Sequence, residues 1–210
     1  YGAVTDYEQW RTKLANEAAL RAMVKSFGIK PEGLDLNAFF FSTHTFFAII
    51  TKLLAYLIVG RYTNLEAGSL AGWETLSNDD LRGRLADLEQ GDPFKKAGIA
   101  NFLEGDFFSW YQKYFTSELA AGLRDVVKRL GEYDPATLDL APAPTQDLLK
   151  KVYHRRVPPA IRKALGEYYT PDWLALRVLN MLDGGNWQGH PDTRMLDPTC
   201  GSGTFMLLAI

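Results

Sequence analysis

The sequence predicts a mainly α-helical chain, in which a helical domain over residues 1–144 is followed by the start of an α/β domain over residues 145–210. Two observations support this fold class. Apolar residues recur at helical spacing through most of the first 130 positions. After residue 192, a short strand candidate, a glycine-rich turn and an apolar helix follow one another, which is typical of an α/β unit. The chain has 210 residues, of which 47% are apolar, so it can bury a sizeable core.

The first two predicted helices occupy residues 6–27 and 36–62. Thr5 begins a capping box, and Gly28 is a typical C-terminal stop. The second helix is the most apolar part of the chain, and its length approaches that of a membrane span. Lys52 lies within it, and a central lysine is costly in a membrane helix. We therefore expect a core helix packed on several sides and no membrane attachment.

The middle of the chain is less regular. Residues 64–92 are acidic and rich in glycine, which predicts loops and short helices. Residues 102–130 are predicted to be helical, with a stripe of aromatic and leucine side chains on one side. We assign this stripe to the core rather than to a base-stacking surface. Its members are Phe107, Trp110, Tyr111, Tyr114, Phe115, Leu119 and Leu123.

A proline-rich segment, residues 141–144, is predicted to be an extended linker between the two domains. After it, the pattern predicts helices over 146–156, 160–165 and 171–183, a strand over 193–196 and a helix over 204–210. Pro171 suits the first turn of its helix because that position needs no backbone donor.

Charge and cysteine content exclude several classes of protein. The net charge of -2 excludes a uniformly basic nucleic-acid coat, and the single cysteine excludes a disulfide scaffold or a multi-cysteine zinc site. The three histidines show no metal-ligand spacing, so we expect no metal site. Residues 140–177, however, carry seven basic and three acidic groups. The candidate phosphate contacts in this block are Lys150, Lys151, Arg155 and Arg156, and the alternative is a solvated helix face.

The glycine-rich turn carries the main chemical signal. It runs from Asp197 through Gly201 and Gly203 into the last helix. A P-loop requires a lysine after its final glycine, but Thr204 stands there. A dinucleotide fingerprint requires a third glycine, which is missing. S-adenosylmethionine remains the best candidate because its cationic sulfonium and amino groups suit the acidic residue. An ordinary turn between a strand and a helix is the alternative.

The same residues resemble a known family. Residues 196–205 are similar to motif I of the N6-adenine DNA methyltransferases of restriction-modification systems, and residues 166–171 resemble motif X. Motif X precedes motif I here, as in the gamma class of these enzymes. Residues 147–165 and, more weakly, 44–54 and 105–111 are similar to segments of the helical connector in type IIG or type I-like enzymes and related phage-defence methylases.

This resemblance implies a Rossmann-like domain that transfers a methyl group from S-adenosylmethionine to N6 of an adenine flipped out of duplex DNA. It also implies duplex DNA, a nuclease domain or subunit and a specificity domain as partners, in a prokaryotic cytoplasm. The implied cofactor contacts are Asp197, Pro198, Thr199, Gly201 and Gly203 in motif I, and Tyr169, Thr170 and Pro171 in motif X.

The catalytic [DNS]-P-P-[YFW] motif of this family does not occur in these 210 residues. The only Pro-Pro pair is Pro158-Pro159, which precedes motif I and is followed by Ala160. We therefore interpret the chain as the front part of a longer enzyme, inactive alone, whose unfinished sheet is covered by a homodimer contact. Two alternatives stay open. One is a helical protein-interaction module with a vestigial turn, and the other is a methyltransferase acting on RNA or protein.

Overall fold

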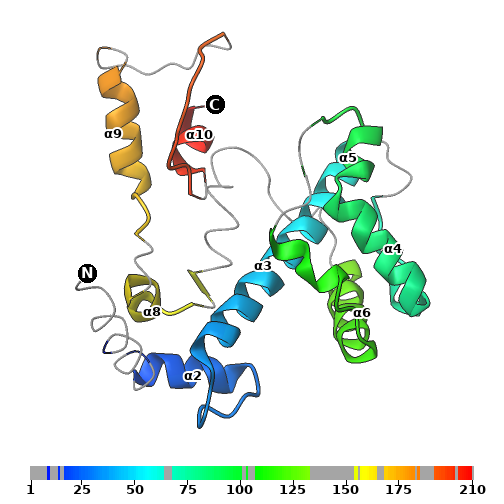
Figure 1. Ribbon diagram of the computed structural model, residues 1–210. Helices are drawn as coiled ribbons and strands as arrows, with labels where there is room; N and C mark the ends of the chain where they lie inside the picture. Colours follow the sequence, from blue (N-terminus) through cyan, green and yellow to red (C-terminus); the bar gives the residue numbers. More distant parts are fainter. Residues whose placement is uncertain are drawn as a thin grey trace. The chain divides into compact units, whose positions relative to one another are not determined.

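The computed structural model describes residues 9, 14, 17–63, 68–100, 103, 107–132, 154–155, 157–164, 168–182, 184, 192–201 and 203–209. This part of the chain is mainly helical, as predicted (Figure 1). The chain divides into a split unit, residues 1–36 with 140–210, and a central unit, residues 37–139. The first 36 residues thus group with the C-terminal segment, whereas the sequence predicts one helical domain over 1–144.

Helix α3 (Leu36–Tyr62) confirms the predicted apolar helix and supplies much of the core of the central unit. Its side chains Ile49, Leu53 and Leu57 are buried in one hydrophobic cluster with residues of the following helices. By length and composition, α3 is also apolar enough to cross a membrane, with 44% of its most apolar window buried inside the protein. Core helices of soluble proteins pass the same test, and the buried cluster supports the prediction of a core helix.

Shorter elements pack with α3 in the central unit. Helix α4 (Asn78–Glu89) begins where the Ser77 hydroxyl accepts a hydrogen bond from the Asp80 N–H at 3.1 Å, so its N-terminus is capped. Leucines at helical spacing along α4 join the core. The other elements are η1 (Trp73–Thr75), α5 (Asp92–Lys96) and α6 (Ser117–Gly131). The acidic segment therefore holds a longer helix than the loops and short helices predicted for it.

The helix predicted over residues 102–130 is not continuous. The structure instead has the 3-10 helix η2 (Phe107–Gln112) and then α6. The break arises because the Thr116 side chain accepts a hydrogen bond from the Leu119 N–H at 3.2 Å, which starts a new helix.

This break also divides the predicted aromatic stripe. Tyr111 and Leu123 are buried, as predicted. Phe107 and Tyr114 are instead 70% and 67% exposed, so the core assignment was wrong for these two residues. In a 3-10 helix, residues three apart lie on one face, so Phe107 shares a face with Trp110 and not with Tyr111.

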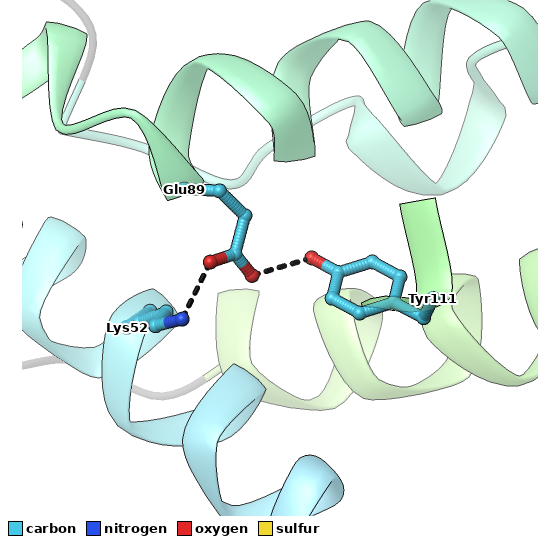
Figure 2. Close-up of polar contacts among 3 residues, drawn as sticks. All are labelled: Lys52, Glu89 and Tyr111. Carbon is cyan, nitrogen blue, oxygen red and sulfur yellow. Dashed lines mark hydrogen bonds and ion pairs between the residues drawn. The ribbon is translucent and has the colours of Figure 1, made fainter. Parts of the chain in front are cut away.

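A buried polar network joins three elements of the central unit. Lys52 on α3 forms an ion pair with Glu89 at the end of α4, with Nζ and Oε2 2.5 Å apart (Figure 2). The Tyr111 hydroxyl on η2 donates to the other carboxylate oxygen of Glu89 at 2.8 Å. All three residues are at most 5% exposed. A buried charge is costly unless it is paired and hydrogen-bonded, so these three side chains require one another.

The split unit contains α2 (Ala18–Ser26), α8 (Pro159–Ala164), α9 (Asp172–Leu182) and α10 (Thr204–Ala209). Helix α2 ends at Ser26, just before the predicted stop at Gly28, whose φ of 74° lies in the left-handed region. The predicted cap at Thr5, the linker 141–144 and most of the helix predicted over 146–156 lie outside the described residues. Helix α9 follows Pro171, as predicted.

The strand predicted over residues 193–196 is not present in the described part of the chain, where this segment is irregular. A strand is defined by hydrogen bonds to a neighbouring strand, and the described residues offer no such neighbour. The Rossmann-like sheet therefore stays a prediction.

Replacing Glu89 by Leu should lower the opening free energy of the central unit by about 3–5 kcal/mol, because Lys52 would remain buried without its partner. Native-state hydrogen exchange of peptides from α4 and α6 measures this. The matched triple variant Lys52→Met, Glu89→Leu, Tyr111→Phe removes all three polar side chains and should recover most of the loss. If Glu89→Leu alone is neutral, the network does not constrain the unit.

Tyr56 should make the stability of the central unit fall in alkaline solution. Burial raises the pKa of its phenol above the ordinary value of 10.0, and the charge of Arg84 offsets part of this effect. The stability is therefore fully present below pH 10 and is lost as the pH rises through the higher pKa of the folded state. Urea denaturation below and above pH 10 should show that Tyr56→Phe loses less stability with rising pH than the unsubstituted protein does. An unchanged loss would contradict this assignment.

Candidate cofactor site

The motif I turn is held by the side chain of its acidic residue. Asp197 Oδ1 accepts hydrogen bonds from the Thr199 N–H at 3.0 Å and from the Thr199 hydroxyl at 3.3 Å. This contact across two residues forms an Asx turn, which fixes the backbone where it leaves the predicted strand. Asp197 is half-buried, so its carboxylate can both hold the turn and meet a ligand.

Two glycines give the turn its shape. Gly201 and Gly203 have φ angles of 55° and 85°, a conformation that other residues rarely adopt. A Cβ atom at Gly203 would have Cys200 Sγ as its nearest neighbour, at 4.0 Å. The backbone conformation, and not crowding by other protein atoms, therefore requires glycine here.

The chain enters α10 directly from this turn. The Gly203 N–H donates to the Cys200 carbonyl at 2.8 Å, and the Leu207 N–H donates to the Gly203 carbonyl at 2.8 Å. Thr204, the first residue of α10, is buried. Cys200 itself is exposed, which fits a small turn residue.

On the motif X side, Tyr169 is anchored by residues near α8. Its ring packs edge-on against His154, with centroids 4.7 Å apart. His154 Nε2 lies 2.8 Å from Arg162 Nη1, and Arg162 Nε donates to the Val157 carbonyl at 3.2 Å. A guanidinium can only donate, so Nε2 accepts and the imidazole of His154 carries its proton on Nδ1. His154 thus supports Tyr169 in this structure.

The segment predicted to be motif X and the turn predicted to be motif I lie at one end of a helix pair. Helices α9 and α10 pack against each other within the split unit. The segment 192–200 runs back from the far end of α9 to the start of α10 (Figure 1). Tyr169, Thr170 and Pro171 precede α9, and the turn precedes α10, so both predicted halves of the cofactor site lie at the same end.

The predicted DNA contacts are only partly described. Arg155 is exposed, whereas Lys150, Lys151 and Arg156 lie outside the described residues. In the described part of the chain, no group of three or more His, Cys, Asp or Glu side chains is arranged to hold a metal ion.

Helix α9 leaves large apolar side chains uncovered in the described structure. Trp173, Met181 and Leu182 are 69%, 71% and 73% exposed. These side chains lie on a helix, whereas the sequence predicts an unfinished sheet that a homodimer contact covers. The sequence does not predict the contacts among Arg162, His154 and Tyr169, because their spacing matches no motif.

Comparison with protein-family models, with curated proteins and with solved structures gives no match for this chain.

Proposed function

We propose that this chain carries the S-adenosylmethionine-binding elements of an N6-adenine DNA methyltransferase of a restriction-modification or phage-defence system. The observation that carries the proposal is the placement of two sequence motifs. The Asp197 turn and the Tyr169–Pro171 segment lie at the same end of the packed helices α9 and α10. An ordinary turn between a strand and a helix does not require a second motif at that position.

The residues at this end suit the proposed cofactor. S-adenosylmethionine would supply a methyl group on a positively charged sulfonium. Asp197 offers a carboxylate for the cationic methionine end, held in place by its bonds to Thr199. Gly201 and Gly203 carry no Cβ, so the backbone of the turn can approach a ligand closely. Tyr169, supported by His154, would close the other side of the cofactor.

The proposed substrate rests on sequence features outside the cofactor site. Adenine in duplex DNA is favoured because motif X precedes motif I and because a helical segment lies upstream. RNA or protein as the substrate keeps the same cofactor site. A helical protein-interaction module would instead need neither the carboxylate of Asp197 nor the basic block. The three experiments below separate these alternatives.

The charge of Asp197 should be required for cofactor contact. Ultraviolet cross-linking of S-adenosylmethionine with a tritiated methyl group, at a concentration high enough for weak binding, should label the chain. Asp197→Asn keeps an oxygen acceptor for the Thr199 N–H but loses the charge, so labelling should fall about tenfold. Asp192→Ala removes an exposed acidic residue before the turn and should have no effect. Equal labelling of all three proteins would contradict the proposed site.

The chain alone should not transfer methyl groups to DNA. The [DNS]-P-P-[YFW] motif, which would hold the adenine amine, is missing from these residues. An assay with radiolabelled S-adenosylmethionine and adenine-rich duplex DNA should therefore give only background incorporation. Turnover above background would show that other residues perform the catalytic role and would overturn this assignment.

The basic block should distinguish DNA binding from protein docking. Reversing the charge of Lys150, Lys151, Arg155 and Arg156 should weaken binding to duplex DNA by at least about tenfold and flatten its salt dependence. Fluorescence anisotropy with labelled DNA at several salt concentrations measures both. A variant that keeps its DNA affinity but loses self-association or subunit association would favour the interaction module.

A further inference from the structure

A cluster of aromatic side chains reaches the surface of the central unit, outside the proposed cofactor site. The Phe41 ring on α3 lies 5.5 Å from the Phe107 ring and 5.1 Å from the Trp110 ring, measured between centroids. The Tyr114 ring lies 6.2 Å from Trp110. Phe107 and Tyr114 are exposed, while Phe41 and Trp110 are half-buried. We call these four residues the aromatic surface.

Hydrogen bonds to α3 hold Trp110 in place within this surface. Trp110 Nε1 donates to the Thr45 hydroxyl at 2.9 Å, and that hydroxyl donates to the Phe41 carbonyl at 2.9 Å. The hydroxyl of the neighbouring Tyr111 donates instead to buried Glu89 (Figure 2). The Trp110 ring is therefore fixed before any partner arrives, and the Phe41 and Tyr114 rings pack against it, which lowers the side-chain entropy lost on binding. Contiguous exposed aromatic rings of this kind are typical of interaction sites.

The charge of this part of the chain favours a positively charged partner. Residues 64–139, which include three of the four residues of the aromatic surface, contain fourteen acidic and eight basic groups. Hydrogen bonds from its own backbone N–H and from the Thr116 side chain lower the pKa of Glu118, which keeps this exposed carboxyl ionised. This balance repels a phosphate backbone. It attracts a guanidinium, which also binds favourably over the face of an aromatic ring.

We propose that the aromatic surface binds an arginine-containing, extended segment of a protein partner. Arginine side chains would lie over the exposed rings of Phe107 and Tyr114, in a part of the chain that carries a net negative charge. This proposal is independent of the methyltransferase assignment, because it uses only residues of the central unit.

The test uses the whole chain and a fluorescent, C-terminally amidated peptide of alternating arginine and proline. The matched peptide carries citrulline in place of arginine, which keeps the shape but removes the charge. Anisotropy should show binding of the arginine peptide and about tenfold weaker binding of the citrulline peptide. The double variant Phe107→Ala, Tyr114→Ala should also bind about tenfold more weakly, since each exposed ring contributes a modest cation–π term. Phe46→Ala removes an exposed ring elsewhere on α3 and should bind normally.

A second variant separates loss of contact from loss of folding. Glu118→Gln changes one exposed carboxyl and leaves the rings intact, so it should weaken the arginine peptide about threefold without changing the circular dichroism spectrum. The proposal is overturned if the arginine peptide fails to bind, if both peptides bind equally, or if the double variant binds normally. The proposal is also overturned if the chain binds a single-stranded oligonucleotide and the double variant does not. The surface would then be a base-stacking platform.

Discussion

The buried ion pair between Lys52 and Glu89 is the interaction on which the central unit depends. Apolar packing alone would let α3 rotate, because this helix is apolar on most of its surface. A charged lysine in the core allows only the rotation that meets the carboxylate at the end of α4. Tyr111 binds the second oxygen of the same carboxylate, which sets the register of η2. That register places Phe107 and Trp110 on the other side, so the core network also positions the aromatic surface.

In the split unit, by contrast, contacts between residues close in sequence determine the shape of the candidate site. The side chain of Asp197 and the left-handed conformation of Gly203 determine the path of the turn within a few residues. Long-range packing enters through α9 and α10, which bring motif X to the same end as this turn. The uncovered apolar residues of α9, such as Trp173, show that this packing leaves an apolar surface in the described structure.

Local signals in the sequence predicted most of the helices but not the contacts between them. The apolar run of α3, the stop at Gly28 and the start of α9 after Pro171 each depend on a few neighbouring residues. The partner of Lys52 lies 37 residues away, so no periodic pattern reveals it. The break before α6 depends on one side-chain hydrogen bond of Thr116, which a continuous apolar pattern conceals. The turn of the candidate site was predictable because its glycines are required by backbone conformation.

The most direct measurement of the central claim is to determine the coding sequence that follows the codon for Ile210. The proposed function predicts an open reading frame with a [DNS]-P-P-[YFW] motif roughly 60–150 codons downstream, which would supply the groups that hold the flipped adenine. A stop codon soon after Ile210 would contradict it. The chain would then contain no adenine-binding motif, and the helical interaction module would be the better interpretation.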